Sequence, residues 1–467
     1  MSRNSRGQVI ENLKVENYAA EGKCIAKHEE KVIFLEYCAP GDIVDVQITH
    51  SKKSWAEAKV INYKEKSALR IEPSCEHFTI CGGCKWQHIP YSEQTTYKEN
   101  QVKDQFERIG KLPFEKILPI IGSNEQYYYR NKLDFTFSNK KWLTDSQIKS
   151  DDNFDRRALG FHIPGRFDKI LDVSKCFLQA DPSNQIRNEL RNFCIENDFE
   201  FFDIATKKGF VRNLIIRTAS TGDLMVIVQV FENQEKNIKS ICDFLASKFP
   251  EITSLNYVVN PKMNETFHDL DIICVKGKPY IEEEMEELKF RIGPKTFYQT
   301  NSKQAYILYT ATRNLAEIKE TDLVYDLYTG AGTIANFVAK KAKKVVGVEY
   351  VPQAIEDAKI NSEINGISNT VFYAGDMKNV LNDEFIAQNG KPDVIITDPP
   401  RAGMDEKVIL KILEIAPKRI VYVSCNPATQ ARDLALMKEQ YHIKTVQPVD
   451  MFPQTYHVEN IVLLELK

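Results

Sequence analysis

The chain has 467 residues, of which 43% are hydrophobic and 27% charged, a composition that excludes an intrinsically disordered protein and predicts roughly three domains. The net charge of −3 neither indicates nor excludes a nucleic-acid partner. No apolar run reaches about eighteen residues, so we expect no transmembrane helix, and the polar start predicts no signal peptide. Ten cysteines then favour a reducing, cytoplasmic location.

Residues 1–65 alternate short apolar strands with turn signals such as Glu21-Gly22 and Ala39-Pro40-Gly41-Asp42. The predicted strands are Val9–Val15, Lys23–Ala26, Lys31–Leu35, Ile43–Thr49 and Trp55–Tyr63. Five strands in such a short segment are typical of a small closed barrel of the OB type, which often binds RNA. The sequence favours an RNA-binding barrel and a plain β-module equally.

Residues 66–290 are predicted as a central α+β domain that opens with closely spaced cysteines. Cys75, Cys81 and Cys84 lie within ten residues, and Gly82-Gly83 permits the tight loop that lets several sulfurs face one centre. Three thiolates need a fourth, for which Cys176 is the candidate. Four thiolates suit either a [4Fe–4S] cluster or zinc, and the spacing does not choose between them. The acidic run 282–287 is expected to be a solvated connector to the last domain.

Residues 291–467 alternate strands and helices, which predicts a doubly wound, Rossmann-like α/β sheet. The predicted strands are Leu323–Leu327, Val345–Val348, Val371–Tyr373, Val394–Thr397 and Ile420–Ser424, followed by an antiparallel pair near His442–Pro448 and Asn460–Leu466. Helical spacing is found at Thr333–Lys341 and Pro352–Asn365. Ligands of such sheets bind beyond the carboxyl ends of the strands.

Acidic residues stand at the ends of the first three of these strands. Asp326 precedes a glycine-containing turn, Tyr328–Thr333, that opens a helix, while Glu349 and Asp376 follow the next two strands. The turn lacks the third glycine of a pyrophosphate-binding loop, and strand-end acids suit a ligand that has ribose hydroxyls and a positive charge. S-adenosylmethionine fits this pattern better than the competing interpretation, a nicotinamide dinucleotide.

The later strand ends carry candidates for chemistry. Asp398-Pro399-Pro400-Arg401 follows the fourth strand, and the rigid prolines direct Asp398 toward the expected ligand site. Cys425 precedes a helix N-terminus, where the helix dipole is expected to favour the nucleophilic thiolate. Glu459 or His457, just before the last strand, is a candidate for proton transfer.

Together these pieces resemble the RNA uracil-5 methyltransferase family over essentially the whole chain, most closely its 23S rRNA enzymes. By this resemblance the first domain is an RNA-binding TRAM barrel, and Cys75, Cys81, Cys84 and Cys176 are ligands of a [4Fe–4S] cluster. Phe297-Tyr298-Gln299-Thr300-Asn301 resembles the family's F-x-Q-x-N signature. The residues that would bind the methyl donor are Gln299, Tyr328, Thr333, Glu349, Asp376 and Asp398.

The resemblance implies methylation of C5 of a uridine in RNA, with Cys425 as the nucleophile and Glu459 as the base. The substrate is expected to be 23S rRNA, with tRNA as the alternative, and the enzyme is expected to be a monomer that does not bind membranes. Two rival functions fit these residues less well. Amino-group methylation does not need Cys425, and cytosine-5 methyltransferases use a cysteine in a motif other than Ser-Cys-Asn-Pro. A non-catalytic RNA-binding protein would not need Gln299, Glu349, Asp398, Cys425 and Glu459 together.

Overall fold

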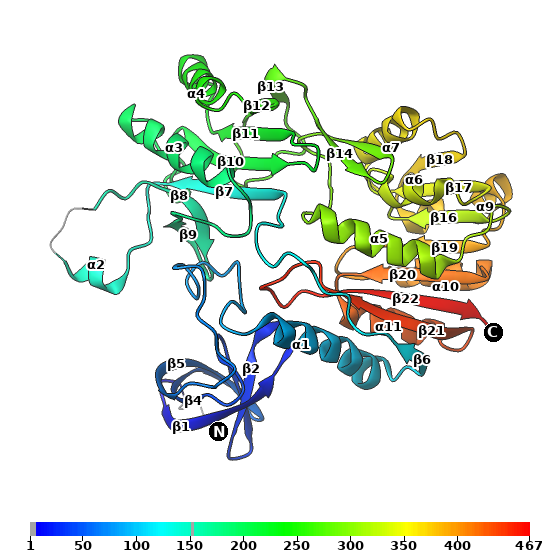
Figure 1. Cartoon of the computed structure of the whole chain (residues 1–467), viewed down its shortest axis with the longest axis horizontal. Helices are drawn as coiled ribbons and strands as arrows, with labels where there is room; N and C mark the ends of the chain where they lie inside the picture. The colour runs from blue at the N-terminus through cyan, green and yellow to red at the C-terminus, as the bar shows by residue number, and fades with distance from the viewer. Residues whose placement is uncertain (1–5, 151–153) are drawn as a thin grey trace.

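The computed structural model describes residues 6–150 and 154–467, which form a closed barrel, a seven-stranded sheet, a two-stranded hairpin and an eight-stranded sheet (Figure 1). The barrel lies at one end of the molecule, and the two large sheets lie side by side above and beside it. No helix of the described residues is long and apolar enough to cross a membrane.

The N-terminal barrel confirms the predicted five strands, which close in the order β1-β2-β3-β5-β4. Its elements are β1 (Val9–Tyr18), the short 3-10 helix η1 (Ala20–Gly22), β2 (Cys24–His28), β3 (Lys31–Leu35), β4 (Ile43–Ser51) and β5 (Trp55–Glu65). Alternate residues point inward, among them Val15, Ile33 and Val46, which are fully or almost fully buried. The barrel therefore has a hydrophobic core of its own.

The second sheet is mostly antiparallel, with β11 and β12 as its parallel pair, and its order is β13-β12-β11-β10-β7-β8-β9. Helices α3 and α4 pack against one face and close a separate core. The elements are β7 (Lys132–Ser138), α2 (Asp145–Lys149), β8 (Ala158–Ile163), β9 (Arg166–Asp172), α3 (Ser183–Glu196), β10 (Val211–Thr218), β11 (Leu224–Val230), α4 (Glu235–Lys248), β12 (Ser254–Val259) and β13 (Ile272–Gly277). This arrangement agrees with the predicted α+β character.

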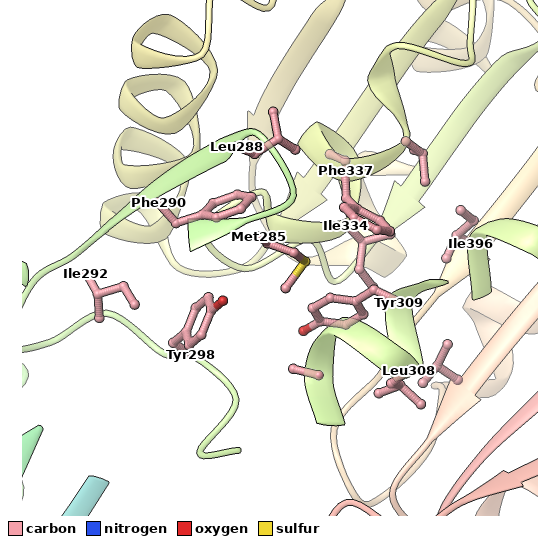
Figure 2. Packing of buried hydrophobic residues seen from close by; sticks show 14 of the residues in the cluster. Met285, Leu288, Phe290, Ile292, Tyr298, Leu308, Tyr309, Ile334, Phe337 and Ile396 are labelled. Atoms are coloured by element: carbon pink, nitrogen blue, oxygen red, sulfur yellow. The ribbon is translucent and has the colours of Figure 1, made fainter. Parts of the chain in front are cut away.

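The acidic run 282–287 is not a solvated connector, because most of it lies in a hairpin of β14 (Ile281–Met285) and β15 (Leu288–Ile292). Glu283 is fully buried and accepts hydrogen bonds from Ser302 Oγ at 2.6 Å and from the Ser220 amide at 2.9 Å. The apolar side chains of the hairpin pack with Tyr309 and with Phe337 (Figure 2). The hairpin thus docks on the C-terminal domain, and its charges alternate with core residues.

The C-terminal sheet confirms the doubly wound prediction, with the order β18-β17-β16-β19-β20-β22-β21-β6. The strands from β18 to β20 are parallel, whereas β22 runs antiparallel to both β20 and β21. The elements are α5 (Ser302–Ala316), β16 (Leu323–Leu327), α6 (Thr333–Ala339), β17 (Lys344–Glu349), α7 (Pro352–Ile364), β18 (Thr370–Ala374), α8 (Met377–Val380), α9 (Asp383–Asn389), β19 (Val394–Thr397), α10 (Glu406–Ile415), β20 (Arg419–Ser424), α11 (Pro427–Met437), β21 (Tyr441–Val449) and β22 (Glu459–Leu466).

A segment that precedes the second sheet completes the C-terminal one. Helix α1 (Tyr91–Asp104) continues into a π-helical turn, η2 (Gln105–Gly110), and then into β6 (Phe114–Ile117), which pairs in parallel with β21. Figure 1 shows α1 running from the barrel to this edge of the sheet. The sequence did not predict β6, because four residues with two charges carry no clear strand pattern.

An ion pair joins the barrel to the segment that follows it, through Asp42 in the turn before β4 and Arg70 after β5. The Asp42 carboxylate is fully buried, and it accepts two hydrogen bonds from the Arg70 guanidinium at 2.8 and 2.7 Å. The backbone amides of Ala39 and Ser67 also donate to it. These partners together hold the pKa of Asp42 below its usual range, although burial acts in the opposite direction.

We predict that Arg70→Met lowers the free energy of unfolding by about 3 kcal/mol, because it leaves the Asp42 carboxylate buried without its counter-ion. A lowered native pKa stabilises the fold above the unfolded pKa, so this stability is lost as the pH falls through the acidic carboxyl range. Urea unfolding at several pH values should show a smaller acid dependence in the variant. Lys27→Met, which breaks the exposed Lys27–Glu16 pair of the same barrel, should change stability by less than about 1 kcal/mol.

Candidate active site and cysteine cluster

The predicted donor-binding residues lie along one edge of the C-terminal sheet, where the parallel strands end. Glu349 is the last residue of β17, and its carboxylate accepts hydrogen bonds from the backbone amides of Gly330 at 3.1 Å and Val351 at 3.0 Å. Gly332 has a φ of 74°, and a Cβ there would lie 2.8 Å from the Ala358 Cβ. The glycine turn therefore packs tightly between β16 and α7 and holds Glu349 in place.

The turn after β16 adds a buried carboxyl and an aromatic ring. Asp326 accepts a 2.5 Å hydrogen bond from the Thr329 hydroxyl, and burial raises the pKa of Asp326 to about 7, with smaller contributions from the charges of Asp398 and Glu349. Tyr328 adopts a left-handed backbone conformation, with a φ of 65°, and burial raises its pKa to about 12. Several carboxyls thus face one region, which suits a positively charged ligand.

Two further candidates lie on the helices that follow these strands. Thr333 is the buried first residue of α6. Asp376 caps α8 by accepting a hydrogen bond from the Lys378 amide, and its carboxylate also forms an ion pair with the Lys378 ammonium at 3.2 Å. The Asp376 carboxylate therefore stabilises the start of α8 through Lys378, and it also lies at the edge of the sheet where the parallel strands end.

The segment that carries Gln299 reaches the same edge from the end of the hairpin. Its backbone is fixed because Asn131 Nδ2 donates to the Gln299 carbonyl at 2.9 Å, and Asn301 Nδ2 donates to the Met451 carbonyl at 2.9 Å. The Gln299 side chain interacts with the hydroxyl of Tyr309, a buried residue of α5. Burial raises the pKa of Tyr309 well above its usual value, and the Gln299 side chain acts in the opposite direction. Phe297 instead exposes 73% of its surface and so offers a free aromatic face.

The predicted nucleophile and base are brought together by strand pairing. In the β20–β22 register Ser424 pairs with Asn460, so Cys425 and Glu459, the next residues outward, lie at the same end of the two strands. Asp398 follows β19, which pairs in parallel with β20, so its carboxyl lies at the same end of the sheet as Cys425 and Glu459. Cys425 is half-buried and Glu459 buried.

The charges in this site differ from the expectation that the helix dipole makes Cys425 a thiolate. Burial raises the pKa of Cys425 to about 11, and the negative charges of Glu459 and Asp398 contribute to the rise. Burial also raises the pKa of Asp398, and burial together with the Asp398 charge raises that of Glu459. Burial and the neighbouring carboxylates therefore favour the neutral thiol of Cys425, in the direction opposite to that expected from the dipole of α11.

His457, the alternative candidate for proton transfer, has a different environment. Burial lowers its pKa to about 4, and the positive charges of Arg401, Lys98 and Arg130 contribute to the shift. The ring is therefore neutral at neutral pH and surrounded by cations. The raised pKa of Glu459 is closer to neutrality, so Glu459 is the better matched of the two to exchange a proton at neutral pH.

Two residues that the sequence analysis missed help to fix this site. Tyr309 is coupled to Asp398 and Glu459, and its aromatic ring packs in the core shown in Figure 2. The buried carboxylate of Asp433 accepts hydrogen bonds from the Met404 amide at 2.8 Å and the Tyr422 hydroxyl at 2.7 Å, and so ties the loop after Asp398 to α11. The sequence offered one signal for Asp433, an acidic residue inside a predicted amphipathic helix. It offered no signal that marked Tyr309 as part of the site.

The four predicted metal-binding cysteines lie around one cavity of about 860 Å³ between the segment 75–88 and the hairpin of β8 and β9. Cys75, Cys81, Cys84 and Cys176 all line it. Burial raises the pKa of each thiol, most strongly for Cys84, which reaches about 12. Within residues 6–150 and 154–467, no three His, Cys, Asp or Glu side chains converge closely enough to hold a single metal ion.

Contacts within the chain help to fix the loops that carry these cysteines. A Cβ on Gly82, whose φ is 75°, would lie 2.3 Å from Pro164, so the loop requires glycine here. The Cys176 amide donates to Asn184 Oδ1 at 2.8 Å. Arg187, fully buried, donates to the carbonyls of Val173 and Ser174 and so braces the same loop. The four sulfurs therefore belong to preformed loops that share one cavity.

We predict that Cys425 reacts slowly with iodoacetamide at pH 7 and that its rate rises toward alkaline pH, because only the thiolate is nucleophilic. Glu459→Gln removes a negative neighbour and should shift this profile to lower pH by roughly one unit. Peptide mass spectrometry would follow the rate, with half-buried Cys274 as an internal control that the substitution leaves unchanged. Reaction at pH 7 as fast as that of an ordinary free thiol would contradict the neutral state of Cys425.

Comparison with known proteins agrees with this geometry. Residues 272–467 match the family described as tRNA (Uracil-5-)-methyltransferase, and residues 4–61 match the TRAM domain. A protein of Bacteroides thetaiotaomicron named as an uncharacterized RNA methyltransferase is 57% identical over 453 residues, which cover 96% of this chain and all of the relative. A relative of the same description from Chlorobaculum tepidum is 38% identical and covers 98% of this chain and 97% of its own.

A solved structure resembles the whole chain. The tRNA (uracil-54, C5)-methyltransferase of Pyrococcus abyssi, in complex with S-adenosyl-L-homocysteine, has a TM-score of 0.74 at 26% identity. The match covers 97% of this chain and 99% of the Pyrococcus protein, so barrel, central sheet and C-terminal sheet correspond together. The chain therefore belongs to the RNA uracil-5 methyltransferase family and is an RNA methyltransferase with an N-terminal TRAM domain.

Proposed function

We propose that the protein transfers a methyl group from S-adenosylmethionine to C5 of a specific uridine in RNA. The observation that carries this proposal is the convergence of Cys425, Glu459 and Asp398 at the carboxyl edge of the sheet, beside the predicted donor site. We assign RNA binding to residues 1–65, the cysteine cluster to residues 66–290 and catalysis to residues 291–467.

The proposed donor site uses the residues predicted from sequence. The Glu349 carboxylate, held by two backbone amides, is placed to accept hydrogen bonds from ribose hydroxyls. Gln299, Tyr328, Thr333, Asp376 and Asp398 would surround the rest of the donor. A surplus of carboxyls at this edge suits the positive sulfonium, and the related Pyrococcus protein is bound to the demethylated product, S-adenosyl-L-homocysteine.

The chemistry needs both Cys425 and Glu459. C5 of uracil is a weak nucleophile, and addition of the Cys425 thiolate to C6 makes C5 an enolate-like carbon that attacks the methyl group on sulfur. The adduct then carries both methyl and hydrogen on C5. Glu459 removes that proton, the double bond between C5 and C6 forms again, and the thiolate leaves.

The raised pKa values of the two carboxyls fit this sequence. A Glu459 that holds a proton does not repel the thiolate of Cys425, whereas an ionised Glu459 is needed later to accept the C5 proton. A pKa near neutrality lets one carboxyl take both states during a cycle. The positive charge of a bound donor beside Asp398 would favour ionisation of both groups and of the thiol.

We propose 23S rRNA as the substrate, because the family resemblance links a barrel with a cysteine cluster mostly to enzymes of large-subunit rRNA. The Pyrococcus relative, which acts on tRNA, supports the alternative. In either RNA the target uridine must leave its stack to reach Cys425, and exposed Phe297 offers a stacking surface. Mapping 5-methyluridine in rRNA and tRNA from a deletion strain would distinguish the two substrates.

We predict that Cys425→Ala abolishes methylation, because without addition to C6 the C5 carbon does not become nucleophilic. Glu459→Gln should still add and methylate but should lose its protein–RNA adduct slowly, because the C5 proton has no acceptor. Denaturing gels of each variant with RNA and donor would show the adduct as a retarded band.

The same gels also test the assignments against each other. RNA with 5-fluorouridine at the target should trap the wild-type protein, since fluorine does not leave as a cation. Methylation of C5 by Cys425→Ala would rule out Cys425 as nucleophile. Normal turnover by Glu459→Gln would move the role of base to another residue, with His457 as the first candidate.

We further propose that Cys75, Cys81, Cys84 and Cys176 hold a [4Fe–4S] cluster. Their loops are preformed around one cavity, which supports a shared ligand. In such a cluster each of the four thiolates would bind a different iron, whereas a zinc site would need all four around one ion. The cluster would join the segment 75–84 to the loop after β9.

We predict that protein purified without oxygen is brown and contains iron, with broad absorption near ~400 nm from thiolate-bound iron. Cys176→Ser should lose most of the iron because it removes one of four ligands, whereas Cys274→Ser, outside the cavity, should keep it. Metal analysis and the absorption spectrum are the measurements. Stoichiometric zinc without iron in the anaerobic wild-type protein would overturn the assignment.

A further inference from the structure

The loop 450–458 connects β21 to β22 and ends directly before Glu459. In the pairing of these strands Val449 lies opposite Glu459. Both ends of the loop are therefore next to this residue pair, which contains the proposed base. Asp450, the first loop residue, therefore lies one residue beyond the strand partner of Glu459. A displacement of Asp450 would be transmitted to Glu459 over a single residue pair.

Asp450 is held by a buried ion pair from another part of the chain. Lys98 of α1 donates to Asp450 Oδ1 at 2.6 Å, and the side chains of both residues are fully buried. The Tyr91 hydroxyl donates to Oδ2 at 2.9 Å, and the Lys98 ammonium also donates to the Phe452 carbonyl at 3.0 Å. The ammonium therefore binds two points of the loop at once.

The remaining contacts fix the backbone of the same loop. The Gln94 side chain of α1 exchanges two hydrogen bonds with Gln454, at 3.0 and 2.9 Å. The Gln304 side chain donates to the Asp450 carbonyl at 2.8 Å, and the Tyr129 hydroxyl donates to the Pro453 carbonyl at 2.9 Å. These bonds are all between neutral groups, whereas the bond from Lys98 to Asp450 joins opposite charges away from water.

We propose that Lys98, through its ion pair with Asp450, is a positioning residue that holds Glu459 opposite Cys425 for removal of the C5 proton. This inference rests on the proposed function, in which Glu459 is the base. Lys98 contacts neither RNA nor donor in this account. Its effect is expected to fall on one step, because the hydrogen bonds of its ammonium go to Asp450 and Phe452 of the loop before Glu459, whereas Cys425 lies between the end of β20 and the start of α11.

The proposal requires that loss of the ion pair slows decay of the protein–RNA adduct more than its formation. Lys98→Met alone would leave a buried, unpaired carboxylate, so the test uses the double variant Lys98→Met with Asp450→Asn, which removes both charges and retains the shapes. Rapid-quench experiments with RNA and S-adenosylmethionine would measure adduct formation and decay separately. We expect decay to slow by about tenfold to a hundredfold, as for a misplaced catalytic group, with formation changed by less than about twofold.

A matched control tests whether lost stability alone has this effect. Arg419 Nη2 and Asp322 Oδ2, 3.0 Å apart, form a largely buried pair, less enclosed than Lys98 and Asp450, at the opposite end of β20. Arg419→Met with Asp322→Asn should lower the melting temperature without separating the two rates. Tyr91→Phe, which removes one hydrogen bond to Asp450, should slow decay in the same direction by a smaller factor, and it decides the test if the double variant does not fold.

The role of Lys98 would be overturned if the double variant changed the rates of adduct formation and decay equally, or changed neither rate. It would also be overturned if the control variant slowed decay selectively in the same way. Adding the double variant to Glu459→Gln should slow decay no further, because both changes act on the same proton transfer. Normal turnover by Glu459→Gln alone would instead remove the base assignment itself and this inference with it, so the two failures are distinguishable.

Discussion

The antiparallel pairing of β22 with β20 is the constraint on which the site depends. A sheet of purely parallel strands brings together residues that follow the strands, and this accounts for Glu349, Asp398 and Cys425. A residue that begins a strand reaches the same edge only if its strand runs the other way, as Glu459 does. The reversal at β22 therefore supplies a carboxyl on the far side of Cys425, where the parallel part of the sheet has no strand end to offer.

Burial of this carboxyl sets the chemistry of the resting protein. Burial raises the pKa of both Glu459 and Asp398, and the charge of Asp398 adds to the shift of Glu459. Burial and the charges of these two carboxyls also raise the pKa of Cys425. In the proposed mechanism, a Cys425 that is neutral until the cationic donor binds would be less exposed to alkylation and oxidation in the absence of substrate. The proposal thus links the reactivity of Cys425 to occupancy of the donor site through electrostatics.

Local sequence patterns predicted most helices and strands correctly. The features that they did not predict depend on contacts between residues far apart in the sequence. The barrel strands, the parallel strands and the strand-end residues follow from periodicity and turn signals, because each is encoded within a few neighbouring residues. The prediction that the acidic run 282–287 is a solvated connector was wrong because the buried carboxylate of Glu283 accepts hydrogen bonds from Ser220 and Ser302, which are distant in the sequence. The thiol state of Cys425 likewise depends on Asp398 and Glu459, which a local reading of one helix N-terminus does not include.

The loop 450–458 shows why a three-part chain can behave as one catalytic unit. The aromatic rings of Tyr18 in the barrel and Tyr97 in α1 lie 3.4 Å apart between centroids, and Lys98, the next residue, binds Asp450. On the cysteine-bearing segment, the Trp86 amide donates to the Gln454 carbonyl. The loop before Glu459 is thus contacted by the helix that touches the barrel and by the segment that carries the cysteines. The proposed role of Lys98 therefore implies that a substitution that loosens either contact affects the carboxyl beside Cys425, even though it lies outside the C-terminal sheet.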